Sequence, residues 1–282
     1  MKRKFIYFCL LTILLFCNCK NPFGDDEIAG LRTKITGKVT VLGDAKPAGV
    51  YVWLEQINVG VFTDEDGEFA LRLPSKATMP EIEGLSGTFS LYFFTINFQL
   101  ETARVLIRDG EFEYGKADID KIGRLSNDVT LKKSFQVVSE VSLSESIKYG
   151  KIDTTINVRT TISATMGTVT INIPNGTEHF LGAICLRNMD SGQVQLSASA
   201  NPLNKTYKFL VPVTTSGTVF EYHMGIKDIK RAKDKYTVVP YIMSTLSVPA
   251  GLYQSIGFDP DYFDTAFAEI LFDHQATEFT IW

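Results

Sequence analysis

Cysteine is scarce in this chain, and its placement excludes a fold held together by disulfides. The 282 residues include 4 cysteines, of which three lie before residue 20 and only Cys185 lies further along. A disulfide needs two thiols, so the folded part cannot form one within itself. The apolar neighbours of Cys185, in Leu181-Gly-Ala-Ile-Cys-Leu186, predict a buried thiol that packs as a small hydrophobe.

Histidine is equally scarce, which removes the common zinc patterns. The chain has 3 histidines, His179, His223 and His274, and none is followed by a glutamate three residues on or by a second histidine four residues on. The sequence also contains no glycine-rich phosphate loop and no Gly-x-Ser-x-Gly nucleophile elbow. We therefore predict no catalytic residue, no cofactor and no metal site.

The apolar stretch near the N-terminus is too short for a membrane-spanning helix. It runs from Phe5 to Phe16, about twelve residues, whereas a bilayer requires roughly 20. Met1-Lys-Arg-Lys4 precedes it, and the polar Lys20-Asn-Pro22 follows the two cysteines at its end. A basic start followed by a short apolar core is typical of a secretion signal.

The segment around Cys19 resembles a bacterial lipoprotein signal, in which a small residue precedes a cysteine that becomes the acylated N-terminus. Cys19 fits better than Cys17, because Asn18 is small and Phe16 is bulky. The pair Phe16 and Cys17 departs from the usual aliphatic and small residues at those positions. The resemblance implies a signal peptide over residues 1–18, lipid attachment at Cys19 and membrane association through the lipid. A cleaved signal without lipid and an uncleaved signal anchor are the alternatives.

The mature chain would be acidic. Removal of the signal takes away Lys2, Arg3 and Lys4 and leaves 25 basic against 32 acidic residues, a formal charge of −7. A negative balance argues against nucleic acid or an anionic surface as a partner, because both require a basic face. Lys20, rather than Asp, would be the second mature residue. By resemblance to lipoproteins of bacteria with two membranes, this favours the outer membrane over the inner one.

Alternating apolar residues separated by turn signals predict an all-β protein. A polar tether over residues 19–32 leads into a first β-rich region at 33–133 and a second at 134–282, with the boundary inside 132–150. The clearest runs are Val50–Leu54, Phe69–Leu73, Phe89–Phe94, Thr168–Ile173, Gln193–Ser197, Tyr207–Val213 and Tyr236–Ile242. Their spacing suits sandwiches or open barrels.

Four local features refine this expectation. Pro212 and Pro240 place their strands at edges or bulges, because proline cannot donate to a ladder. The polar stretch Gly115–Asn127 is predicted to be an exposed loop. One short helix is predicted at Ile226–Ala232.

Three blocks in the first region carry a family resemblance. They are Ile35-Thr-Gly-Lys-Val39, then Lys46-Pro-Ala-Gly-Val-Tyr-Val-Trp-Leu54, then Thr63-Asp-Glu-Asp-Gly-Glu-Phe-Ala-Leu-Arg-Leu-Pro74. Their order is similar to that of the carboxypeptidase regulatory-like domain. The resemblance covers residues 33–133 and implies a transthyretin-like Greek-key sandwich with an accessory rather than a catalytic role. It departs from the pattern at Pro47, which lies one residue closer to Gly49.

The residues of these blocks support turns and strands on their own account. Pro47 fixes φ and Gly49 can take a positive φ, so they start and end a turn. Asp64–Gly67 is predicted to be a hairpin turn, with Gly67 in the left-handed region and Asp64 bonding nearby amides. Its spacing fails the calcium loop of an EF-hand.

Two further signals stay open. The acidic stretch Asp259-Pro-Asp-Tyr-Phe-Asp264 is predicted to be a solvated turn, with oxygen ligation of a divalent ion as the alternative. The aromatic residues Trp53, Tyr92 and Trp282 are predicted to pack in the core, with an exposed strip that binds sugar or protein as the alternative.

The sequence therefore predicts a lipid-anchored cell-envelope protein with a structural or protein-binding role and no catalysis. The alternative is an accessory lipoprotein that captures a glycan or another nutrient, which requires an aromatic strip on the second region. A third hypothesis, an enzyme, requires Asp259, Asp261 and Asp264 to meet a histidine in a pocket.

Overall fold

The computed structural model describes residues 31–43, 46–75, 77–143, 155–225, 229, 234–245, 247–270 and 272–281. The signal peptide predicted at 1–18, the lipid site Cys19 and all but the end of the tether lie outside the described residues, as do Trp282 and, apart from Ile229, the helix predicted at Ile226–Ala232. Residues Thr33–Trp282 form one compact unit. The boundary between residues 133 and 134 stays a prediction.

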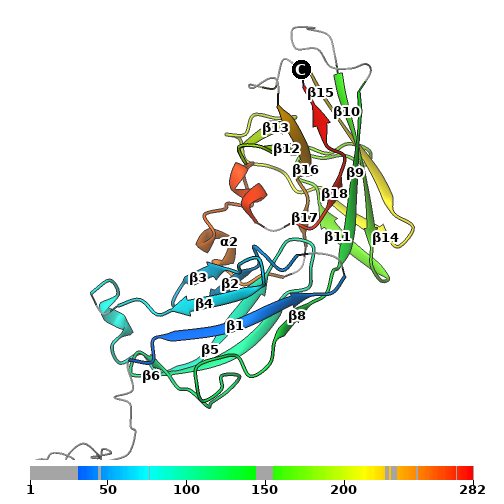
Figure 1. Ribbon diagram of the computed structural model, residues 1–282. Helices are drawn as coiled ribbons and strands as arrows, with labels where there is room; N and C mark the ends of the chain where they lie inside the picture. The colour runs from blue at the N-terminus through cyan, green and yellow to red at the C-terminus, as the bar shows by residue number, and fades with distance from the viewer. Residues whose placement is uncertain are drawn as a thin grey trace, which may run out of the picture. The chain divides into compact units, whose positions relative to one another are not determined.

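The protein is mostly β, and its strands form several sheets with a sandwich-like arrangement (Figure 1). Two sheets belong to the first region. The three-stranded sheet has the order β4 (Glu68–Arg72), β1 (Lys34–Val41) and β8 (Val129–Leu131). The five-stranded sheet has the order β3 (Val59–Phe62), β2 (Tyr51–Leu54), β5 (Gly87–Phe94), β6 (Glu101–Arg108) and β7 (Glu111–Phe112).

Three further sheets belong to the second region. In sheet order they are β15 (Thr218–Gly225), β10 (Thr155–Ala164), β9 (Phe135–Leu143) and β18 (Gln275–Ala276); β14 (Leu210–Thr214), β11 (Thr168–Asn172) and β17 (Met243–Ser244); and β13 (Val194–Ala198), β12 (Ala183–Asn188), β16 (Lys235–Pro240) and β19 (Phe279–Thr280). The helical segments are short: η1 (Pro80–Ile82), α2 (Leu252–Ser255) and η3 (Thr265–Glu269). Within the described ranges, no helix has the length and apolar character needed to cross a membrane.

Strand β1 shows how alternation in the sequence becomes a half-buried strand. Ile35, Gly37 and Val39 are buried, while Thr36 and Lys38 between them are partly exposed. The strand pairs antiparallel with β4, placing Ile35 opposite Leu71, and parallel with β8. Side chains two apart share a face, so the alternating residues of β1 and β4 build one side of the same core.

Strand β2 is buried on both faces, which the alternating pattern did not predict. Val52 and Leu54 pack into the first hydrophobic cluster, with the residues of β1, β4, β5 and β6. Tyr51 and Trp53, on the opposite face, belong to the second cluster, with the residues of β9 to β19. The five-stranded sheet therefore has apolar cover on both sides at β2 and β5, which explains why Thr33–Trp282 is one compact unit.

An aromatic layer covers that second face. The Tyr241 ring stacks on Phe267 with centroids 4.1 Å apart, and Tyr253 meets Phe94 of β5 edge-on at 5.6 Å. Burial raises the pKa of Tyr253 to about 12. The pKa of Tyr241 is also raised by burial, so both phenols stay neutral. The segment that carries Tyr253 and Phe267 is short helices and loops, because its aromatic residues do not alternate as a strand requires.

The turn from Asp64 to Gly67 has the predicted conformation but connects different partners. Gly67 has φ 78°, and the Asp64 carboxylate accepts from the backbone N–H of Asp66 and Glu68 at 3.1 and 2.8 Å. The flanking strands do not pair as a hairpin, since β3 pairs with β2 and β4 pairs with β1. The turn is therefore a crossover between two sheets, and the hairpin prediction was wrong.

The stretch Gly115–Asn127 was predicted to be exposed, and this is wrong for three of its residues, Ile119, Gly123 and Leu125. Ile119 and Leu125 are 2% and 4% exposed. The Asp120 carboxylate accepts the N–H of Arg124 at 2.8 Å, and the N–H of Leu125 donates to the carbonyl of Thr36 on β1. These bonds fold the loop back so that Ile119 and Leu125 reach the first cluster, while Ile122 stays exposed.

Pro212 and Pro240 both lie at positions where the hydrogen-bond ladder of the sheet needs no backbone N–H donor. Pro212 is in β14, the terminal strand of its sheet. Pro240 is the last residue of β16, beyond the part of that strand that pairs with β19. The edge placement predicted for Pro212 is confirmed.

Candidate functional site

The link between β8 and β9 lies at a hollow of the described part of the chain, which Lys132, Lys133 and Ser134 help to line. The N–H of Gln99 donates to the carbonyl of Lys132 at 2.8 Å, and the N–H of Ser134 donates to the carbonyl of Asn97 at 2.8 Å. Thr165 donates its N–H to the Ser134 carbonyl at 3.0 Å. Three segments distant in sequence are therefore fixed by backbone bonds.

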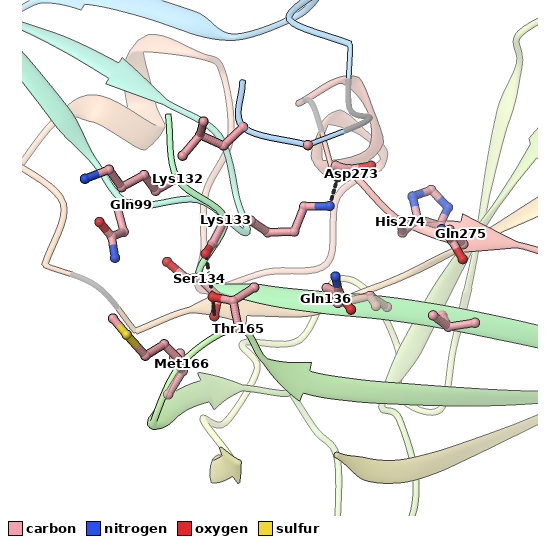
Figure 2. Close-up of a pocket in the computed structure, with 15 residues that line it drawn as sticks. Gln99, Lys132, Lys133, Ser134, Gln136, Thr165, Met166, Asp273, His274 and Gln275 are labelled. Carbon is pink, nitrogen blue, oxygen red and sulfur yellow. Dashed lines mark hydrogen bonds and ion pairs between the residues drawn. The ribbon is translucent and has the colours of Figure 1, made fainter. Parts of the chain in front are cut away.

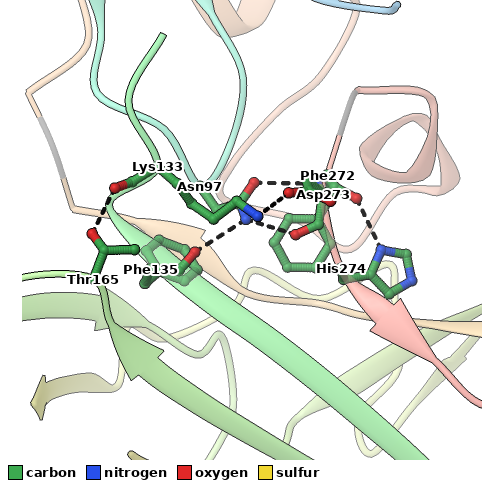
Figure 3. A network of polar contacts seen from close by, with 7 residues as sticks. All are labelled: Asn97, Lys133, Phe135, Thr165, Phe272, Asp273 and His274. Atoms are coloured by element: carbon green, nitrogen blue, oxygen red, sulfur yellow. Dashed lines mark hydrogen bonds and ion pairs between the residues drawn. The ribbon is translucent and has the colours of Figure 1, made fainter. Parts of the chain in front are cut away.

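The Asn97 side chain joins these segments (Figure 3). Its Nδ2 donates to the carbonyl oxygens of Phe135 at 3.2 Å and Asp273 at 2.7 Å, and its Oδ1 accepts the N–H of Asp273 at 3.2 Å. Asn97 is 0% exposed. A buried amide with these bonds is satisfied, and it anchors the β9 start to the chain just before β18.

An ion pair lies beside this amide. The Lys133 ammonium pairs with the Asp273 carboxylate, and it lies 5.7 Å from the centroid of the Phe98 ring. About a fifth of each charged side chain is exposed. The pair is therefore partly shielded from water, and the ring adds a favourable contact for the ammonium.

The hollow above this network has a volume of about 760 Å³ (Figure 2). Its polar wall includes the amides of Gln99, Gln136 and Gln275 and the ammonium of Lys132, and no Phe, Tyr or Trp is among its described lining residues. The Ser134 hydroxyl is buried in this wall and has no hydrogen-bond partner within the described residues. Lys133 and Asp273 also line the hollow but pair with each other, so apart from Lys132 and His274 the polar wall consists of uncharged groups. Its amides both donate and accept, which suits a neutral polar ligand.

The three histidines do not form a site. Both ring nitrogens of His274 lie 2.9 Å from backbone carbonyl oxygens, those of Phe272 and Val238. His223 lies on β15, with Nδ1 2.7 Å from the Asn157 side-chain oxygen. Over the described ranges, no group of three or more His, Cys, Asp or Glu side chains could hold a metal ion.

The acidic residues at 259–264 serve as local caps. Asp259 accepts from the N–H of Asp261, and Asp264 accepts from the N–H of Ala266 at the start of η3, each at 2.9 Å. Asp261 forms an ion pair with Lys205 at 2.6 Å, and the hydrogen bond from Lys205 lowers the pKa of its carboxyl. The three carboxylates therefore have separate structural partners, as the turn prediction requires.

Two predicted core aromatics are in the structure. Trp53 is buried and donates its ring N–H to the Asn58 side-chain oxygen at 3.1 Å. Tyr92 is half-buried, and its ring centroid lies 5.8 Å from that of Trp53. The core prediction is confirmed for Trp53.

Cys185 on β12 is fully buried, as predicted. Burial raises the pKa of its thiol to about 12, and the nearby Arg187 only partly opposes this. The nucleophilic thiolate is therefore almost absent at neutral pH.

We expect Cys185 to resist alkylation in the folded protein. At pH 8, iodoacetamide should modify it more than about a hundredfold more slowly than after unfolding in guanidinium, because the thiol is both buried and protonated. Peptide mass spectrometry of the Cys185 peptide measures the two rates. Labelling of the folded protein at the unfolded rate would contradict the assignment.

Asn97, Lys133 and Asp273 were not predicted from the sequence. One signal was present for Asn97, which interrupts the apolar run Phe93-Phe-Thr-Ile-Asn-Phe98. A polar residue inside such a run has to find hydrogen bonds when the run is buried. Its partners could not be predicted, because Asp273 is 176 residues away.

Comparisons with known proteins give distant similarities only. No protein-family model and no curated protein matches the chain. Among solved structures, the Bacillus anthracis TIE protein matches with a TM-score of 0.24 and 9% identity over 76% of this chain, which spans 29% of that protein. The shaft pilin SpaA from Lactobacillus rhamnosus GG (D295N mutant) matches with a TM-score of 0.23 and 12% identity, over 78% of this chain and 89% of the pilin. The major pilin T-13 from Streptococcus pyogenes matches with a TM-score of 0.21 and 8% identity, over 74% of this chain and 81% of the pilin. Scores this low carry no argument about function.

Proposed function

We propose that this chain is a lipid-anchored protein of a bacterial cell envelope, attached through Cys19, with a structural or protein-binding role and no catalysis. The observation that carries the structural part is the double burial of β2, with Val52 and Leu54 in one cluster and Trp53 in the other. A sheet shared by two clusters joins the β-rich regions into one body, which a short tether would hold at the membrane.

The finer fold is part of this proposal. Residues 33–133 would be a transthyretin-like, carboxypeptidase regulatory-like sandwich, and residues 134–282 a second β-sandwich. Support for the first comes from the turn glycines of its motif, since Gly49 and Gly67 both have positive φ. Further support comes from Thr63, whose hydroxyl accepts the N–H of Val50 at 2.9 Å and donates to the Pro47 carbonyl.

The anchor is tested with Cys19→Ala and a matched control, Cys17→Ala. We expect the wild type and the control to fractionate with membranes and to give intact masses that fit cleavage before residue 19 plus acyl chains. The Cys19→Ala protein should lose the acyl mass and leave the membrane fraction, because two or more acyl chains supply a durable anchor at roughly 0.8 kcal/mol per methylene. A Cys19→Ala protein that stays acylated and membrane-bound would refute the anchor, as would a wild type that is soluble.

The hollow lined by Gln99, Gln136 and Gln275 favours a second candidate function, capture of a neutral polar ligand such as a glycan. Its amide wall supports this, as does the buried Ser134 hydroxyl, which has no hydrogen-bond partner among the described residues. The candidate differs from the first in requiring saturable binding of a soluble ligand. The described lining of this hollow contains no Phe, Tyr or Trp, so it does not supply the aromatic strip that this alternative required.

A further inference from the structure

A second hollow lies between β13 and β15, which are terminal strands of two different sheets in the second region. Its volume is about 650 Å³, and sites for small molecules commonly measure about 300–1,000 Å³. Ser197 of β13 and Tyr222 of β15 both line it, and their hydroxyls form a hydrogen bond of 3.0 Å. The two strands are therefore joined by side chains at the hollow itself.

An exposed aromatic ring stands at this hollow. Phe180 is among its lining residues and is 44% exposed. The ring meets that of His223 edge-on, with centroids 5.7 Å apart. Burying an exposed phenylalanine ring against a ligand is favourable, because the ring loses its contact with water.

The backbone around Phe180 is held by hydrogen bonds. Its N–H donates to the Thr177 hydroxyl at 3.2 Å, and its carbonyl accepts the Thr177 N–H at 2.9 Å. On either side of it, His179 accepts the N–H of Glu221 at 2.7 Å, and Leu181 donates its N–H to the Glu221 carbonyl at 2.9 Å. A ring on a fixed backbone loses little conformational entropy when a ligand binds, so Phe180 is pre-organised as a contact surface.

The rest of the lining is apolar with a few neutral polar groups. Its apolar part consists of Leu181, Leu196, Ala198, Pro202 and Met224, and its polar part includes Ser197, Ser199, Tyr222 and His223. No Asp, Glu, Lys or Arg is among its described lining residues. A fitting ligand therefore has apolar surface and uncharged hydrogen-bonding groups. A sugar ring has this character, because its C–H groups form apolar faces and its hydroxyls project from the edge.

Three other hollows of the described chain lack this combination. The hollow lined by Gln99 has no Phe, Tyr or Trp. In a hollow of about 400 Å³ the aromatic residue is Tyr236, which is 3% exposed. A hollow of about 550 Å³ includes Phe62, which is 42% exposed, but it is also lined by four charged side chains, those of Lys34, Asp64, Glu68 and Arg124.

We propose that the hollow between β13 and β15 binds a neutral carbohydrate, with a sugar ring packed on Phe180 and a sugar hydroxyl bonded to Ser197. A serine hydroxyl donates once and accepts twice, so Ser197 can bond the sugar while it keeps its bond to Tyr222. The inference rests on the second candidate function, glycan capture, and assigns its aromatic contact to a different hollow from the one lined by glutamine amides.

The test compares two substitutions of Phe180. Phe180→Leu keeps an apolar side chain but removes the aromatic face, and we expect it to weaken binding about tenfold. Phe180→Tyr keeps the ring and should bind within about twofold of the wild type. Ser197→Ala should weaken binding about fivefold through loss of one hydrogen bond. The matched control is Phe62→Leu, which alters an equally exposed phenylalanine of the first region and should leave binding unchanged.

The measurement is isothermal titration calorimetry of the full chain in a polyoxyethylene detergent, whose head group is not a sugar. The probes are maltose, cellobiose and N,N′-diacetylchitobiose, each to about 20 mM, so that millimolar dissociation constants are detected. Cyclohexanol is the fourth probe, because it has a six-membered ring of similar size without the set of hydroxyls. We expect saturable binding of at least one disaccharide and none of cyclohexanol.

The outcomes separate this inference from the function on which it rests. If none of the three disaccharides binds, the inference and glycan capture both fail. If a disaccharide binds Phe180→Leu as tightly as the wild type but does not bind Gln136→Ala, glycan capture holds at the other hollow and this inference is overturned. Cyclohexanol binding as tight as that of the disaccharides would also overturn it, because the hollow would then take any apolar ring.

Discussion

Gly67→Ala should destabilise the protein by about 3 kcal/mol or more, one of the two largest effects that we expect from a single substitution. Gly67 has φ 78°, where a side chain costs roughly 1–2 kcal/mol. The position also has no room, because an added Cβ would overlap the Val39 carbonyl oxygen and lie 2.8 Å from the Pro47 Cβ. The Gly67 carbonyl accepts the N–H of Val39 at 2.8 Å, so relief of the overlap would strain the β1–β4 pairing.

Gly84→Ala is the matched control for the backbone cost alone. Gly84 has a similar φ of 83°, and an added Cβ there would meet nothing within 4 Å. We expect a loss of about 1 kcal/mol, and therefore a melting temperature at least several degrees above that of Gly67→Ala. Thermal unfolding followed by circular dichroism gives both values. Equal losses for the two variants would show that packing around Gly67 contributes nothing.

The comparison of these glycines shows where the sequence was informative. The Thr-Asp-x-x-Gly block predicted a turn with Gly67 in the left-handed region, because the local chemistry of Asp64 and a glycine is enough to define that turn. The identity of the strands that the turn connects depends on pairing with β1 and β2, which lie outside the block. Local residues therefore predicted the conformation and not the partners.

Strand β2 shows the same division. Its alternation predicted that Val50, Val52 and Leu54 share a face, and all three lie in the first cluster. The cover over Tyr51 comes from a segment far along the chain, where its hydroxyl donates to the Ser255 carbonyl at 3.2 Å. A period of two identifies the two faces of a strand but cannot say whether a later segment buries the second one.

The candidate site was less predictable than the fold for a related reason. Asn97, Lys133 and Asp273 lie in three separate parts of the sequence, and none stands in a recognisable motif. Their meeting depends on how β8 leads into β9 and on how the chain before β18 returns beside them. Burial of the run around Asn97 could be expected from its aromatic residues, whereas the bonding of the amide is a product of tertiary structure.

Asn97→Ala should lower the free energy of unfolding by about 3–4 kcal/mol, an effect comparable to that of Gly67→Ala. The change removes a fully buried amide that bonds the Phe135 carbonyl and both backbone groups of Asp273. Each net hydrogen bond contributes about 1 kcal/mol, and each buried group left without a partner costs a further 1–3 kcal/mol, roughly. Asn97→Asp should be at least as damaging, because a carboxylate cannot donate to the two carbonyl oxygens.

Two variants separate this amide from more general effects. Asn201→Ala removes an exposed asparagine whose oxygen accepts the N–H of Leu203 at 3.0 Å, and it should cost no more than about 0.5 kcal/mol. Lys133→Met removes the neighbouring ion pair but keeps the apolar stem, and it should cost about 1 kcal/mol, because both charged side chains are partly exposed.

Urea unfolding measures all these losses, and hydrogen exchange at Asp273 reports on the bond itself. The Asp273 N–H should exchange faster in Asn97→Ala, where its acceptor is gone, and retain its protection in Lys133→Met. If Lys133→Met were the more destabilising of the two, the ion pair rather than the amide would hold this junction. The ordering follows from burial: the Asn97 amide is inaccessible to water, which cannot replace its lost bonds, whereas about a fifth of each side chain of the ion pair is exposed.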